Sequence, residues 1–99
     1  MAVLTPEALV YGTTSASEPR ISPDGSQILY TAARADRDAD RATSQVWLMQ
    51  RDGSGARQIT ASGDRNREPR WSADGYWIAF VSDRVKDSSG IYVLPADGP

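Results

Sequence analysis

Residues 18–34 read EPRISPDGSQILYTAAR, and residues 68–84, fifty positions further along, read EPRWSADGYWIAFVSDR. The two stretches are identical at eight of their 17 positions: Glu, Pro, Arg, Ser, Asp, Gly, Ile and the final Arg. Identical residues that recur at one constant offset are typical of an internal repeat.

A second pair of similar stretches follows the first at an offset of 45. The segment QVWLM at 45–49 leads into Asp52-Gly53, and GIYVL at 90–94 leads into Asp97-Gly98. The first unit therefore carries five extra residues between its two blocks. Two consecutive copies of one unit account for most of the chain.

Each unit predicts short antiparallel strands joined by a tight turn. Ser22-Pro23-Asp24-Gly25 fits a type I turn whose glycine takes a left-handed conformation, and Ser72-Ala73-Asp74-Gly75 repeats it. We therefore assign structural roles in these turns to Asp24, Gly25, Asp74 and Gly75. The predicted strands cover residues 20–22, 27–32, 46–50 and 56–60 in the first unit, and 70–72, 77–82 and 91–94 in the second.

Four-stranded antiparallel units of about 40 to 50 residues are typical of β-propeller blades. The apolar run Ile78-Ala79-Phe80-Val81 agrees, because a strand between neighbouring blades is covered on both faces. The sequence predicts an all-β fold: a β-propeller fragment of two four-stranded blades, the second lacking its last strand. A small β-sandwich is the alternative, but it predicts cleaner alternation and no repeat.

The predicted organisation has three segments. Residues 1–17 form an N-terminal extension or short helix, residues 18–62 the first blade, and residues 63–99 an incomplete second blade. Two blades cannot close a ring, since natural propellers have about 4 to 8. The expected partners are therefore the rest of a propeller, or copies of the chain itself.

Composition excludes several classes of function. The 99 residues include no cysteine and no histidine, so disulfides, thiolate metal sites and the commonest general base are absent. A formal charge of −2 argues against nucleic-acid binding. No apolar run reaches the roughly 20 residues of a membrane span, and the first residues lack the pattern of a secretory signal. We expect a cytoplasmic protein without a cofactor, a nucleic-acid partner or a membrane partner.

The repeat motif resembles a known family. Glu-Pro-Arg-x-Ser-x-Asp-Gly, followed by an apolar strand and by Ile-Tyr-Val-Leu-x-x-Asp-Gly, resembles the blade repeat of prolyl oligopeptidase family serine peptidases, especially acylaminoacyl peptidases. Residues 4–9 resemble the short helix that opens many acylaminoacyl peptidases, and the insertion at 34–44 resembles that group's first blade. The repeat also resembles the periplasmic propeller of the Tol-Pal system.

The first resemblance implies a propeller that caps an α/β-hydrolase domain, which carries the family's catalytic Ser, Asp and His. That domain's motifs are absent here, and Gly53-Ser54-Gly55 fits a hairpin turn and not a Gly-x-Ser-x-Gly elbow. The hypothesis is an N-terminal segment without catalytic residues that gates the access of short peptides to the hydrolase domain. The alternative is a protein-binding propeller of the Tol-Pal type with no enzymatic activity.

Three residues are candidates for substrate contact. Arg20 and Arg70 are equivalent in the two repeats, and Trp71 follows on the strand that would line a central channel. The more ordinary expectation is that the arginines hydrogen-bond carbonyls or the Asp24 and Asp74 turns of adjacent blades, and that Trp71, like Trp47 and Trp77, packs between blades.

One segment superficially resembles a calcium loop. Asp36, Asp38 and Asp40 alternate as calcium ligands do, but Arg41 stands where the loop requires glycine and Trp47 where it requires glutamate. We predict a charged loop without a metal site.

Overall fold

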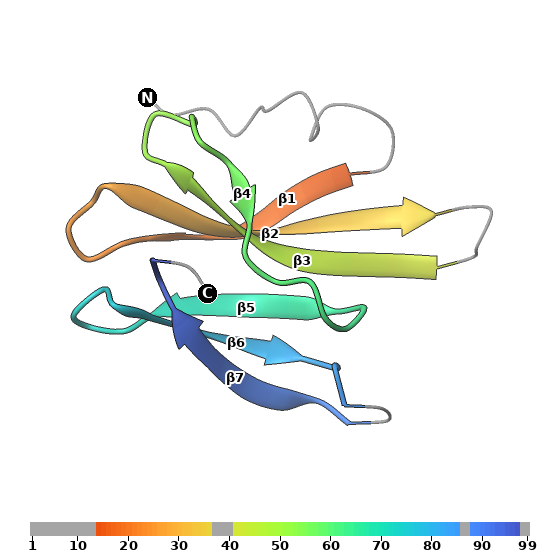
Figure 1. Ribbon diagram of the computed structural model, residues 1–99. Coiled ribbons are helices and arrows are strands. Elements are labelled where there is room, and N and C mark those ends of the chain that lie inside the picture. The colour runs from red at the N-terminus through yellow and green to blue at the C-terminus, as the bar shows by residue number, and fades with distance from the viewer. Residues whose placement is uncertain (1–13, 37–40, 86–87, 98–99) are drawn as a thin grey trace.

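Two antiparallel β-sheets make up the part of the chain that the computed structural model describes, residues 14–36, 41–85 and 88–97 (Figure 1). The strand order is β1-β2-β3-β4 in the first sheet and β5-β6-β7 in the second. The described residues include no helix, so the predicted all-β architecture is confirmed; residues 4–9, the predicted short helix, lie outside them. The strands are β1 (Thr14–Ile21), β2 (Gln27–Asp36), β3 (Arg41–Gln50), β4 (Arg57–Gln58), β5 (Asn66–Trp71), β6 (Trp77–Ser82) and β7 (Gly90–Pro95).

The insertion in the first unit lengthens a hairpin, where the sequence predicted a loop. β2 and β3 pair without interruption from Gln27 opposite Gln50 to Asp36 opposite Arg41. Regular pairing satisfies the backbone donors and acceptors of this segment, which a solvated loop would leave to water. Asp38 and Asp40 lie outside the described residues, as does the side chain of Asp36.

The repeated turns have nearly the same backbone geometry in both sheets. The φ angles of Gly25 and Gly75 are 77° and 78°. Their N–H groups donate to the carbonyls of Ser22 (2.9 Å) and Ser72 (3.0 Å). A residue with a Cβ atom is strained in this left-handed region, so each turn requires glycine.

Replacing either turn glycine tests this geometry. Gly25→Ala and Gly75→Ala should each lower the free energy of unfolding by about 1 to 2 kcal/mol, the cost of a left-handed conformation for a residue with a Cβ. Steric clashes add little, since the new Cβ would meet only Arg51 Nη1 at 4.0 Å or Pro23 Cδ at 3.6 Å. Urea titration measures the loss, and Gly25→Asn should recover part of it. No loss at either site would exclude this turn type.

One of two apolar clusters lies between the two sheets, which are stacked one over the other (Figure 1), and the other is formed by residues of the first sheet alone. Each sheet contributes side chains that are almost fully buried. Full burial of an aliphatic or aromatic side chain is worth roughly 1.5 to 3 kcal/mol, so this junction stabilises the fold substantially. The buried members are Leu29, Val46 and Leu48 from the first sheet, and Ile78, Phe80 and Ala96 from the second part of the chain.

The second sheet is covered on one face only. Ile78 and Phe80 are buried, whereas Ala79 and Val81 are half-buried and Trp77 is 49% exposed. Cover on both faces is the expectation for a blade between two neighbours of a ring, whereas in this chain the second face of the run is bare; the expectation that Trp77 packs between blades was wrong for the described residues. The alternation of β6 sends these side chains to the face opposite the first sheet. No helix among the described residues is long and apolar enough to cross a membrane.

Candidate functional site

The first strand of each sheet carries a bulge at the same place in the repeat. Pairing shifts between Ser17 and Arg20 in β1, and between Arg67 and Arg70 in β5. Glu18 and Glu68 occupy the two bulges, and both have a φ angle of 56°. Non-glycine residues seldom adopt this left-handed conformation, so the two bulges give these glutamates an unusual backbone geometry.

The candidate arginines are held by their own backbone. The guanidinium of Arg20 donates to the carbonyl of Pro19 (3.0 Å), and that of Arg70 to the carbonyl of Pro69 (2.9 Å). Arg20 is half-buried and Arg70 is exposed. These bonds match the carbonyl contacts expected for the arginines, and substrate contact by either residue stays a prediction.

Trp71 connects the two sheets. Its indole N–H donates to the carbonyl of Arg20 (2.9 Å), and the half-buried ring packs against the core between the sheets. The structure therefore brings Trp71 to the backbone of Arg20. Trp47 instead stacks on Tyr30 within the first sheet, with ring centroids 6.5 Å apart.

Glu18 forms a second direct polar link between the two repeats. Its Oε1 accepts the hydroxyl of Thr31 on β2 (2.9 Å) and the backbone N–H of Glu68 on β5 (3.0 Å). A carboxylate acceptor makes these bonds stronger than neutral ones. The repeat showed the two glutamates at equivalent positions, but their contact depends on the bulges, which the sequence does not reveal.

A second polar network, centred on the buried side chain of Asn66, also joins the two sheets. Oε1 of Gln45 accepts the hydroxyl of Thr60 (2.6 Å) and the amide of Asn66 (3.0 Å). Nδ2 of Asn66 also donates to the carbonyl of Ser62 (2.9 Å), and the Thr60 hydroxyl accepts the N–H of Val46 (2.9 Å). The network connects β3, the segment after β4, and the start of β5, and nothing in the repeat predicted it.

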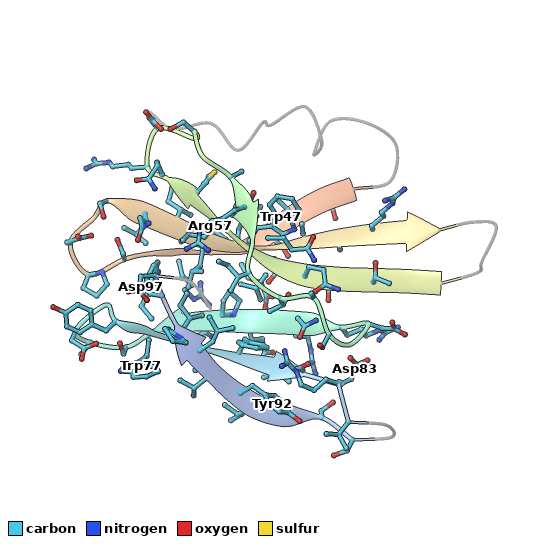
Figure 2. The ribbon with its side chains drawn as sticks, in the orientation of Figure 1. Trp47, Arg57, Trp77, Asp83, Tyr92 and Asp97 are labelled. Carbon is cyan, nitrogen blue, oxygen red and sulfur yellow. The ribbon has the colours of Figure 1, made fainter. Side chains whose placement is uncertain are left out.

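Two further contacts attach the sheets at their edges. Arg57 of β4 extends toward the second sheet, where its Nη2 donates to the carbonyl of Ala96 (3.1 Å; Figure 2). The N–H of Ser44 donates to the carbonyl of Asp64 (2.8 Å). With the core and the two polar links, these bonds fix the second sheet relative to the first.

Arg84 and Asp83 brace the end of β6. The Arg84 guanidinium lies over the rings of Phe80 (5.1 Å) and Tyr92 (4.6 Å), and its Nε donates to the hydroxyl of Ser82 (3.1 Å). Oδ1 of Asp83 accepts the N–H groups of residues 64 (3.0 Å) and 65 (2.9 Å). The N–H of residue 65 is the larger cause that holds the pKa of Asp83 below its usual range. Both side chains have structural partners.

The aspartates of the repeated turns accept several short hydrogen bonds. Oδ1 of Asp24 accepts the hydroxyl of Ser26 (2.7 Å), the N–H of Ser26 (2.9 Å) and the hydroxyl of Ser22 (2.8 Å). These bonds, led by the Ser26 hydroxyl, lower the pKa of Asp24 to about 2. At Asp74 the hydroxyl of Ser72 is the main cause of a lowered pKa. The turns are therefore built on ionised carboxylates.

Acid should loosen the first turn. Because the folded-state pKa of Asp24 lies below its value in the unfolded chain, its contribution is complete above about pH 4. The contribution is then lost as the pH falls toward 2. Asp24→Asn should flatten the fall of the thermal midpoint over this window, and Ser26→Ala should act in the same direction. Equal slopes in wild type and Asp24→Asn would contradict the assignment.

The described residues contain no cluster of three or more His, Cys, Asp or Glu that could hold a metal ion. Without histidine anywhere in the sequence, a Ser-His-Asp triad cannot form within this chain. The site is an interface between two sheets. It consists of the hydrogen bonds of Glu18 and Trp71, the network around Asn66, and the apolar cluster between the sheets.

Comparisons with known proteins point to peptidases. No family model matches the chain. The chain is 32% identical over 84 residues to the Bacillus subtilis protein named uncharacterized peptidase YuxL, covering 85% of this chain and 13% of that protein. It is 39% identical over 80 residues to dipeptidyl-peptidase 5 of Porphyromonas gingivalis, covering 81% and 12%. In fold it matches the acylaminoacyl peptidase of Pyrococcus horikoshii, with a TM-score of 0.66 and 17% identity over 96% of this chain and 14% of that one.

The resemblance to prolyl oligopeptidase-type peptidases is confirmed. Two of the relatives are peptidases by name at 32% and 39% identity, and the acylaminoacyl peptidase shows the same arrangement of strands. Each sheet therefore corresponds to one of the two blades predicted from the sequence. The chain spans only 13% and 12% of the length of these two relatives, so these matches concern a small part of each peptidase.

Proposed function

We propose that this chain is a non-catalytic propeller segment of a prolyl oligopeptidase-type serine peptidase, in which it limits the access of peptides to a separate hydrolase domain. The supporting observation is similarity to named peptidases over more than 80% of a chain that has no histidine. Such a segment can restrict access to an active site and contact the substrate, while the nucleophile and its general base belong to the hydrolase domain. Short peptides are the proposed substrate class, and a cytoplasmic location stays a prediction from the sequence.

The mechanism that we propose is steric. Two blades joined by buried apolar side chains and several inter-sheet hydrogen bonds form a rigid wall. A wall of this kind discriminates by substrate size and needs no group that changes its protonation during the reaction. Arg20 and Arg70, equivalent residues of the innermost strands, are the proposed contacts for peptide carbonyls or carboxylates.

A segment exchange tests the proposal. In dipeptidyl-peptidase 5 of Porphyromonas gingivalis, the segment that matches this chain is replaced by the equivalent residues of this chain, and a second variant lacks the segment. The chimera should react with a fluorophosphonate probe and cleave short chromogenic peptides but not a folded protein. The deletion variant, if it reacts with the probe, should cleave long and unfolded polypeptides relatively better.

The matched control is the 99-residue chain alone, which should neither react with the probe nor turn over any peptide. Turnover by the isolated chain would refute a non-catalytic role. A chimera and a deletion variant with the same preference between short and long substrates would refute gating.

A further inference from the structure

Tight turns of this protein are built on the dipeptide Asp-Gly. The sequence contains four such pairs, and three of them lie wholly within the described residues: Asp24-Gly25, Asp52-Gly53 and Asp74-Gly75. Asp-Gly is prone to spontaneous isomerisation of the backbone, because glycine has no side chain that keeps its nitrogen away from the aspartate carboxyl group. The turns therefore depend on a dipeptide that is chemically weak.

The isomerisation consumes and returns one molecule of water. The glycine nitrogen forms a bond to Cγ of the aspartate, while a carboxyl oxygen leaves as water with the amide proton and the proton of the neutral carboxylic acid. Water then opens the cyclic succinimide at the original main-chain carbonyl, which leaves the peptide bond on Cγ. The product is isoaspartate, whose main chain is longer by one carbon atom. The attack requires a neutral carboxyl group and an amide nitrogen that is free to approach it.

The folded turns hold the glycine nitrogens in hydrogen bonds. The N–H groups of Gly25, Gly53 and Gly75 each donate to the carbonyl three residues earlier, at 2.9, 2.8 and 3.0 Å. The φ angles of these glycines are 77°, 90° and 78°, so all three are fixed in the left-handed region. Each nitrogen must therefore break its turn hydrogen bond before it can attack.

The folded turns also keep the carboxyl groups ionised. Oδ1 of Asp24 accepts the hydroxyl (2.7 Å) and the N–H (2.9 Å) of Ser26. Oδ1 of Asp52 accepts the hydroxyl (2.5 Å) and the N–H (2.9 Å) of Ser54. These serine hydroxyls are the largest cause that lowers the pKa of each carboxyl group, to about 2 for Asp24. Because one pKa unit corresponds to about a tenfold change, the neutral form that reacts is strongly depleted.

We propose that Asp24, Asp52 and Asp74 are latent sites of isoaspartate formation, each protected in the folded chain by a serine of its own turn. At Asp74 the protecting residue is Ser72, which precedes the aspartate and donates its hydroxyl to Oδ1. Asp24 accepts the hydroxyls of two serines and is the slowest site to react. Modification takes place where a turn opens or before the chain folds. The proposal is independent of any peptidase activity.

Isoaspartate in a turn distorts more than the turn itself. The extra main-chain atom displaces the glycine N–H from the carbonyl that it bonds in the native turn. At Asp74 the distortion reaches the other sheet, because an atom added to Cα of Gly75 would meet Pro23 Cδ at 3.6 Å. The second repeated turn lies against the first, so modification at Asp74 disturbs the contact between the two sheets.

The test is an ageing experiment on the 99-residue chain, incubated at about pH 6 with and without urea. Peptide mapping by mass spectrometry, with fragmentation that distinguishes isoaspartate from aspartate, gives the rate at each site. All three sites should react about tenfold or more slowly in the folded chain than in urea. Equal rates under the two conditions would overturn the proposal.

Two variants assign the protection to particular serines. Ser26→Ala should raise the rate at Asp24 by about tenfold, the factor for one lost hydrogen bond to a charged acceptor, and leave Asp52 unchanged. Ser54→Ala should do the reverse. Ser26→Thr keeps a hydroxyl at the same position and should retain most of the protection.

Ser17→Ala is the matched control, since it removes an exposed hydroxyl of β1 outside the turns and should change no rate. An unchanged rate at Asp24 in Ser26→Ala would refute protection by the serine. Equal acceleration at all three sites in that variant would refute it as well, because general unfolding, and not the local hydrogen bond, would then control the reaction.

Discussion

Phe80→Ala should lower the free energy of unfolding by about 3 to 5 kcal/mol, the usual cost of removing a large aromatic ring from a core. Phe80 is 1% exposed and belongs to the cluster that joins the two blades. Its ring also stacks on Tyr92, with centroids 6.2 Å apart, and carries the Arg84 guanidinium on one face. Truncation therefore removes buried area, leaves a cavity and releases a cation.

The size of this effect relative to total stability makes the measurement decisive. A domain of this length is typically stable by about 5 to 15 kcal/mol, so the variant should be partly or wholly unfolded under conditions where the wild type is folded. Urea titration followed by circular dichroism gives the free energy. Ile91→Ala, an exposed residue of the same blade, is the control and should change it by about 0.5 kcal/mol or less. Similar losses in the two variants would show that the sheets do not meet at Phe80.

The parts of the fold that the sequence predicts depend on local chemistry. Asp24 and Gly25, with their copies fifty residues later, specify a turn by hydrogen bonding and a left-handed glycine, and both need only neighbouring residues. The repeat then predicts that the second unit has the same turn and the same strands as the first. For this reason the blades and their strand order follow from the sequence with little help from tertiary structure.

The failures of sequence reasoning concern contacts that depend on a neighbouring sheet. The apolar run that contains Phe80 predicts cover on both faces only where a blade lies between two neighbours. Whether a neighbour is present on each face is not encoded in the run, so Trp77 was wrongly expected to pack between blades and is exposed. The extension of β2 and β3 through the insertion depends on pairing across a hairpin. Propensity alone gives no sign of such pairing.

The polar joints were missed for a related reason. A glutamate gives no indication in the sequence that its backbone is left-handed, and only that conformation brings Glu18 to the N–H of Glu68. The repetition of glutamate at both positions was the available sign, and it suggested no particular role. Gln45 and Asn66 had no such sign, because their contact joins residues that are not equivalent in the repeat.

Removing the amide of Asn66 should have the second largest effect. Asn66 is fully buried, and its Nδ2 satisfies both Gln45 Oε1 and the carbonyl of Ser62. Asn66→Leu keeps the branched skeleton of the side chain, with methyl groups in place of the amide oxygen and nitrogen, and leaves these acceptors with fewer donors. Gln45 Oε1 keeps the hydroxyl of Thr60 and Ser62 is exposed, so neither acceptor is fully orphaned, and we expect a loss of about 1 to 3 kcal/mol.

The expected loss for Asn66→Leu differs in kind from that for Phe80→Ala, since apolar volume is retained and only hydrogen bonds are removed. Gln50→Leu is the matched control: it replaces an exposed amide at the end of β3 and should change stability by about 0.5 kcal/mol or less. Hydrogen exchange should also locate the damage, with faster exchange at Val46, whose N–H is bonded to the Thr60 hydroxyl of the same network. If Asn66→Leu matches the wild type in urea titration, the amide network contributes nothing to the joint, and the apolar cluster alone holds the blades together.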